Sequence, residues 1–111
     1  VPVAVVRADE GARGHYAEGE GRMLVNGDRR RFHPLELRGA NLEFGDAFAH
    51  DEDEFLHVLE GRLEVDLGDR GTFTLGPGDS VYYVGGTPHR WRSLEAGGYR
   101  LFVVKEHPAR L

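Results

Sequence analysis

Short runs with apolar residues at every second position, separated by turn residues, dominate the second half of the chain. Two such runs, 54–60 and 63–67, flank Gly61 and predict a β-hairpin. Further strands are expected at 72–75, 80–84, 89–93 and 99–105, with turns at 69–71, 76–79, 85–88 and 95–98. In the turn 76–79, Pro77 and Gly78 take the second and third positions, which is typical of a type II turn.

The first half carries a weaker pattern, from which four elements are expected. They are an edge strand at 3–6, a mobile loop at 9–21 that holds four glycines, and two strands at 22–25 and 32–38 joined by a turn at Asn26-Gly27-Asp28. Pro34 favours an edge position for the last of these strands. The whole pattern predicts nine or ten strands with no helical period, which indicates an all-β sandwich or barrel.

Composition and charge restrict the class of protein. The 111 residues leave room for one domain, 1–111. No apolar stretch approaches the roughly 20 residues of a membrane helix, and the N-terminus lacks a secretory pattern. The absence of cysteine fits a reducing cytoplasm. A net charge of −5 argues against direct binding of nucleic acid.

Strand parity brings polar side chains from distant segments to one interior. Residues two apart in a strand share a face, so an inward Glu54 implies an inward Leu56 and Val58. His50 and Glu54 would then meet His89 from the later strand as a metal site. Two imidazoles and one carboxylate with open positions suit Fe(II) and other divalent first-row metals, and zinc accepts the same ligands. The expected wall of the ligand pocket consists of Phe48, Leu56, Val58 and Trp91.

Two motifs in this half resemble those of the cupin superfamily. The first cupin motif, G-x5-H-x-H-x3,4-E-x6-G, is matched in its second half by His50-x3-Glu54-x6-Gly61. The spacing of the second, G-x5-P-x-G-x2-H-x3-N, is followed by Gly78-x5-Val84-x-Gly86-x2-His89-x3-Ser93. The resemblance covers about residues 40–105. It implies a cupin-type double-stranded β-helix (jelly-roll barrel), with 40–105 as the barrel core and 1–21 as an N-terminal arm and loop. It also implies a metal inside one end and a homodimer.

Phe48 is the main departure from the cupin pattern, because it occupies the position of the first histidine of the motif. A site here would have three protein ligands, which can still bind a metal. A bulky apolar side chain can instead shape a pocket for an organic ligand, and some cupins have lost their metal.

Three functions remain open on the sequence. The segments 54–61, 76–80 and 88–90 look most like the cupin sensor domains that follow a helix-turn-helix in bacterial transcription regulators, and the start at Val1 would suit such a domain. On that interpretation, the interior holds a divalent metal (Fe, Mn, Ni or Zn) or a small-molecule effector. The second is a stand-alone cupin metalloenzyme of the dioxygenase, isomerase or epimerase type. The third is a metal-free cupin that binds an organic ligand.

Overall fold

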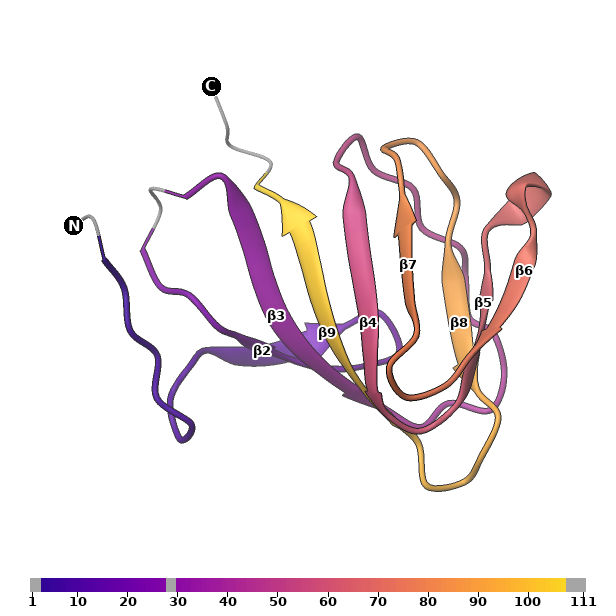
Figure 1. Cartoon of the computed structure of the whole chain (residues 1–111), viewed down its shortest axis with the longest axis horizontal. Coiled ribbons are helices and arrows are strands. Elements are labelled where there is room, and N and C mark those ends of the chain that lie inside the picture. Colours follow the sequence, from indigo (N-terminus) through magenta and orange to yellow (C-terminus); the bar gives the residue numbers. More distant parts are fainter. Residues whose placement is uncertain (1–2, 28–29, 108–111) are drawn as a thin grey trace.

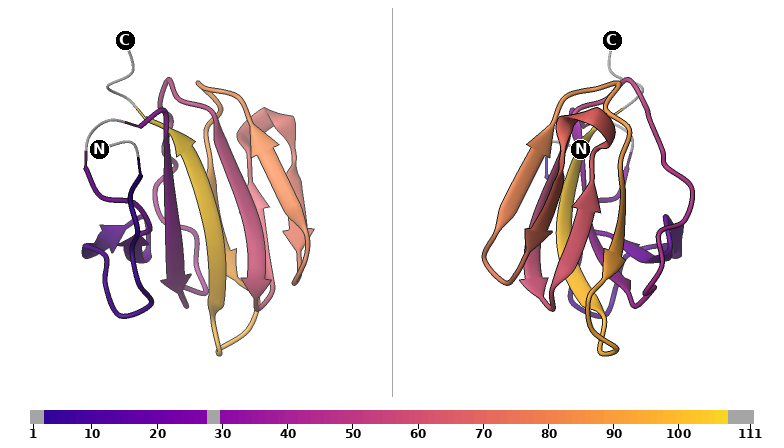
Figure 2. Two further views of the ribbon diagram at one scale, coloured as in Figure 1. Left: turned by 60° about the vertical axis from the view of Figure 1, so that its left-hand side comes forward. Right: turned by 90° about the vertical axis from the view of Figure 1, so that its right-hand side faces the viewer.

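Two antiparallel sheets form opposite walls of an open barrel (Figures 1 and 2). The computed structural model describes residues 3–27 and 30–107. Nine strands lie in this part of the chain: β1 (Arg13–Tyr16), β2 (Gly19–Met23), β3 (Phe32–Gly39), β4 (Glu54–Glu60), β5 (Leu63–Asp66), β6 (Thr72–Leu75), β7 (Ser80–Tyr83), β8 (Arg90–Ser93) and β9 (Tyr99–Glu106). The larger sheet has the order β1-β2-β3-β9-β4-β7, and the smaller has the order β6-β5-β8. The architecture is the all-β jelly roll that the sequence predicts.

The strands predicted in the second half are confirmed, but the predicted pairing of two of them is wrong. The run 54–67 is not a hairpin, because β4 pairs with β7 and β9 while β5 pairs with β6 and β8 in the other sheet. Gly61 carries the chain between the sheets with φ of 85°, and a Cβ there would lie 2.2 Å from the carbonyl oxygen of Gly98. The short 3₁₀ turn Gly68–Arg70 connects β5 to β6.

The first half departs further from expectation. Residues 3–6 form no strand, and the expected loop at 9–21 contains β1 and the start of β2. Gly11 and Gly19 allow a close approach of neighbouring backbone there. A Cβ on Gly19 would lie 2.1 Å from the carbonyl oxygen of Arg38, and one on Gly21 would lie 3.1 Å from Tyr16 Cβ.

The link between β2 and β3 is longer than an Asn-Gly hairpin turn. Met23 pairs with Leu35, so the connection is much longer than two residues, and Asp28 of the expected turn lies outside the described residues. Pro34 is not on an edge strand, because β3 lies between β2 and β9. Proline is tolerated at position 34 because the pairing of β3 with β2 begins only at Leu35, so no N–H of residue 34 is needed for it.

The core lies between the sheets and is built in rows across the larger one. The rows Leu35–Val103–Leu56 and Leu37–Leu101–Val58 follow the strand register, and all six side chains are fully buried. Leu63, Val65 and Trp91 close the core from the smaller sheet. Among the described residues, no helix is long and apolar enough to cross a membrane.

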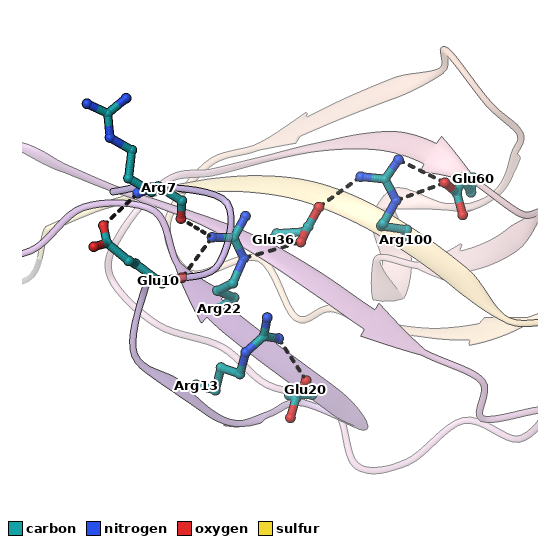
Figure 3. Close-up of polar contacts among 8 residues, drawn as sticks. All are labelled: Arg7, Glu10, Arg13, Glu20, Arg22, Glu36, Glu60 and Arg100. Carbon is teal, nitrogen blue, oxygen red and sulfur yellow. Dashed lines mark hydrogen bonds and ion pairs between the residues drawn. The ribbon is translucent and has the colours of Figure 1, made fainter. Parts of the chain in front are cut away.

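The outer face of the larger sheet carries a row of alternating charges, shown in Figure 3. Arg22 on β2 lies 3.5 Å from Glu36 on β3, Arg100 on β9 lies 2.8 Å from Glu36, and Arg100 also lies 2.8 Å from Glu60 on β4. We call Arg22, Glu36, Arg100 and Glu60 the outer ion-pair row. Each of its four charges has an opposite charge beside it.

Candidate metal centre

One row of the inner face is polar where the rows beside it are apolar. The register aligns His33 on β3 with Lys105 on β9, Lys105 with Glu54 on β4, and Glu54 with Tyr83 on β7. These four residues, which we call the mouth row, continue the inward parity of Leu35, Val103 and Leu56. The mouth row therefore ends the apolar core with titratable groups at the upper end of the barrel in Figure 1.

The triad expected from the sequence comes together at this row. Glu54 begins β4, His50 lies in the loop before it, and His89 precedes β8. The Nε2 atom of His50 lies 2.9 Å from Glu54 Oε1, and the Nε2 atom of His89 lies 3.7 Å from the same oxygen. One donor atom from each of the three residues lies within 4.8 Å of the other two.

Backbone contacts hold the two ligand-bearing loops against each other. Phe48 and His89 exchange two backbone hydrogen bonds, and Gly86 N–H donates to the His50 carbonyl at 2.7 Å. Gly85 N–H donates to Asp53 Oδ1, also at 2.7 Å. A Cβ on Gly85 would lie only 1.9 Å from the carbonyl oxygen of Asp51, so this approach requires glycine.

Each imidazole is oriented through the nitrogen that faces away from Glu54. Nδ1 of His50 lies 3.0 Å from the carbonyl oxygen of Glu52, and Nδ1 of His89 lies 2.9 Å from that of Thr87. A carbonyl only accepts, so each Nδ1 carries the proton and donates it. In a neutral ring this leaves a lone pair on Nε2, aimed at Glu54, which is how histidines are prepared for a metal ion.

Burial makes this arrangement costly without a cation. Glu54 is 1% exposed and His89 is 4% exposed. Burial, together with the charges of His50 and Lys105, lowers the pKa of His89 despite its bond to Thr87 and the charge of Glu54. Oε2 of Glu54 and the hydroxyl of Tyr83 are buried, and neither forms a hydrogen bond of standard geometry among the described residues. Burial, the charge of Glu54 and the contact of the hydroxyl with the Glu54 carboxylate raise the pKa of Tyr83, so its hydroxyl stays protonated. A divalent cation fits this donor set, because it replaces the missing positive charge between carboxylate and imidazoles.

An open pocket of about 230 Å³ leads to the two imidazoles. Its walls include Phe48, Trp91, Tyr16 and Lys105 as well as His50 and His89. Phe48 is 45% exposed and lies at the rim, whereas Trp91 is buried deeper. Leu56 and Val58, which were also expected in the pocket wall, lie in the apolar core below and do not line this pocket.

Comparison with known proteins now identifies the family. Residues 40–105 match the family model described as Cupin domain. This chain is a cupin. A search of curated proteins finds no similar sequence.

Solved structures agree with this assignment at the level of the fold. An RmlC-like cupin from Shewanella frigidimarina has a TM-score of 0.78 at 16% identity, covering 96% of this chain and 92% of its own. KdgF from Halomonas sp. has a TM-score of 0.75 at 17% identity, covering 97% and 96%. A variant of the Bacillus subtilis oxalate decarboxylase OxdC has a TM-score of 0.77 at 19% identity, and the match covers all of this chain but 31% of that one.

Four pocket residues of this cupin were missed at the sequence level: His15, Tyr16, Ala17 and Lys105. Lys105 follows the inward parity of Leu101 and Val103, and that signal was available in the last strand. Tyr16 had no such signal, because it lies in the glycine-rich segment expected to be a loop. Burial and the charge of Glu54 raise the pKa of Tyr16 above its usual range, so its hydroxyl also stays protonated.

Four other features lie near the site. His15 is exposed but also lines the pocket. His57 lies on the outer side of β4, as its parity predicts, and contacts Ser80 Oγ at 2.7 Å. Of the two adjacent tyrosines, Tyr83 points inward and Tyr82 is 59% exposed. In the acidic run 51–53, only Asp51 is exposed, and Glu52 and Asp53 are half-buried.

Proposed function

We propose that this cupin binds one divalent first-row metal ion through His50, Glu54 and His89, and binds a small organic molecule in the adjoining pocket. One observation carries the proposal: both Nε2 atoms face one oxygen of Glu54, while both Nδ1 atoms donate to backbone carbonyls. Fe, Mn, Ni and Zn all accept this ligand set. When bound, such an ion supplies a Lewis acid with positions open to an organic ligand.

Elemental analysis tests the metal site directly. Untagged wild-type protein should carry about one equivalent of Fe, Mn, Ni or Zn, and His50→Ala and His89→Ala should each lose it. His57→Ala is the matched control, because His57 lies on the outer face of β4 and should keep the metal. Metal absent from the wild type after reconstitution would refute the proposal and leave the metal-free ligand-binding cupin.

The biological role that we favour is sensing, as the effector-binding domain of a bacterial transcription regulator. A physical link supports it: Asp53, next to Glu54, accepts a hydrogen bond from the hydroxyl of Tyr82 on the outer face of the sheet. The backbone N–H of Asp53 also donates to Glu106 Oε1, at the end of β9, at 2.8 Å. A ligand that shifts the loop 50–54 would therefore change the outer surface. Reading the native gene for an upstream helix-turn-helix tests this role.

A metalloenzyme is the second candidate, and the new pocket residues favour it. Tyr16 and Lys105 carry exchangeable protons and line the same pocket as His50 and His89. In this role the two side chains would bind, orient and donate protons to the substrate. The test is turnover of candidate substrates by metal-loaded protein. Turnover lost in both His50→Ala and Tyr16→Phe would support an enzyme, and binding without turnover supports the sensor.

A homodimer and a cytoplasmic location belong to the same proposal. The outer face of the larger sheet carries an apolar row, Pro34–Val104–Phe55–Tyr82, aligned by the strand register. It lies beside the outer ion-pair row, whose two positive and two negative charges can complement those of a second copy turned by a twofold axis. Light scattering should find a dimer, and Phe55→Glu should dissociate it. Phe73→Glu, at an exposed site on the smaller sheet, should not. Cell fractionation tests the location.

A further inference from the structure

The lining of the pocket differs in charge from the chain as a whole. The protein has a net charge of −5, yet no aspartate or glutamate lines the pocket among the described residues. Its lining offers the ammonium group of Lys105, the hydroxyl of Tyr16 and the imidazoles of His15, His50 and His89. With a divalent ion held by Glu54, the centre gains further positive charge.

Lys105 is the unusual member of this set. It is the only lysine of the chain, in which the other thirteen basic residues are arginines. Within the described ranges 3–27 and 30–107, Lys105 forms no ion pair, whereas Arg22, Arg90, Arg92 and Arg100 all pair with carboxylates. Its ammonium lies 5.8 Å from the centre of the Tyr16 ring. The structure therefore keeps one cation beside the triad that forms no ion pair among the described residues, although its cross-strand neighbour is Glu54.

We infer that the ligand of this cupin is a small organic acid, whose carboxylate is bound by Lys105 and the hydroxyl of Tyr16 beside the metal. This inference rests on the proposed function and adds the chemical class of the ligand. An ammonium and a hydroxyl are both donors and match the acceptor oxygens of a carboxylate. The pocket, at about 230 Å³, is large enough to admit a small metabolite.

Calorimetry with matched ligands tests the inference. Zinc-loaded wild-type protein is titrated with glycolate, lactate and 2-oxobutyrate, each beside its uncharged amide. The acids should bind about tenfold or more tightly than their amides, because only the acids pair with an unneutralised ammonium. Each amide keeps the size of its acid and the hydroxyl or keto oxygen next to the carboxyl carbon. The comparison therefore isolates the charge of the carboxylate.

Variants identify the residues responsible. Lys105→Met should reduce the preference for acids over amides by about tenfold, leaving the part due to zinc, while zinc stays at about one equivalent. Lys105→Arg should retain more of the preference. Tyr16→Phe should weaken acid binding by a smaller factor, about threefold to tenfold, because one donor is lost. Arg38→Met removes one positive charge from the outer face of the same sheet and should change neither zinc nor acid binding.

The outcomes separate the inference from the proposed function. If the wild type binds none of Fe, Mn, Ni or Zn after reconstitution, both are overturned. If zinc binds but acids and amides bind equally, or if Lys105→Met keeps the full preference of the wild type, the metal site stands and the acid-binding role of Lys105 is overturned. Equal effects of Lys105→Met and Arg38→Met would also overturn it, because a general change in charge would then explain the result.

Discussion

Two charged rows cross the same six-stranded sheet on opposite faces, and they differ in how their charges are paired. In the outer ion-pair row, every charge has an opposite charge within 3.5 Å on the next strand. In the mouth row, Glu54 directs one oxygen at two imidazoles, and its other oxygen forms no hydrogen bond of standard geometry among the described residues. Lys105 is aligned with Glu54 but forms no ion pair with it.

The comparison shows how a structural charge can be told from one that binds a ligand. Paired charges near the surface satisfy each other and contribute little beyond local order. Buried charges without a partner cost free energy, and they persist where a ligand completes them. By this criterion, the outer ion-pair row stabilises the fold, and the mouth row is the candidate ligand site.

The largest expected contrast comes from making one substitution in both rows. Glu54→Gln should weaken zinc binding by about 100-fold or more. This loss exceeds the roughly 10- to 100-fold expected when a residue that only hydrogen-bonds to a metal ligand is removed. Glu36→Gln, in the outer ion-pair row, should leave zinc binding unchanged. Competition with a fluorescent zinc chelator measures both.

The metal-free proteins should rank in the opposite order. Glu54→Gln removes a buried charge with an unsatisfied oxygen, so its free energy of unfolding should equal or exceed that of the wild type. Glu36→Gln should lose about 1 kcal/mol, because Arg22 and Arg100 lose their shared partner. If both variants destabilise the metal-free protein equally, the mouth row is only structural.

Much of the candidate site was predictable because it depends on local spacing. His50 and Glu54 are four residues apart, and parity alone places Glu54 on the buried face with Leu56. His89 could be added because its strand and turns have clear local signals. The positions of these residues follow from the two-residue period of strands and from the residues that form turns. Both can be recognised in a single sequence.

The rest depended on long-range contacts that local patterns do not carry. The pattern on either side of Gly61 fits a hairpin equally well, and only the packing of two sheets sends β5 away from β4. Tyr16 reaches the pocket because Gly19 and Gly21 allow β2 to pack closely, although glycine-rich sequence usually indicates a loop.

A smaller effect is expected from the backbone contact that joins the two ligand loops. Gly85→Ala places a Cβ against the carbonyl of Asp51 and should move the loop that carries His89 relative to His50. We expect zinc affinity to fall by about 10- to 100-fold, as for other changes that misplace ligands. The control is Gly97→Ala, which meets no atom within 4 Å and should bind zinc normally. Normal zinc affinity in Gly85→Ala would show that this contact does not position the ligands.

Acid should affect the outer ion-pair row in a defined direction. Burial alone would raise the pKa of Glu36, but the hydrogen bond from Arg100 and the charges of the neighbouring arginines lower it below 4.5. As pH falls, Glu36 is protonated in the unfolded chain before it is protonated in the folded protein. The stabilisation by the Glu36 carboxylate is therefore complete above pH 4.5 and is lost as pH falls through the lower pKa of the folded state. Urea unfolding should show the wild type and Glu36→Gln converging in that acidic range. A difference that grows as pH falls would contradict the assigned sign.

The smallest effect is expected where a charge pair is fully exposed. Arg13 and Glu20 pair at 3.3 Å across β1 and β2, but their side chains are 51% and 58% exposed. Water and salt screen such a pair, so Arg13→Ala should change the free energy of unfolding by about 0.5 kcal/mol or less. A loss as large as that in Glu36→Gln would mean that position on the sheet, rather than pairing and burial, sets the strength of these charges. The distinction between the two rows would then have to rest on metal binding alone.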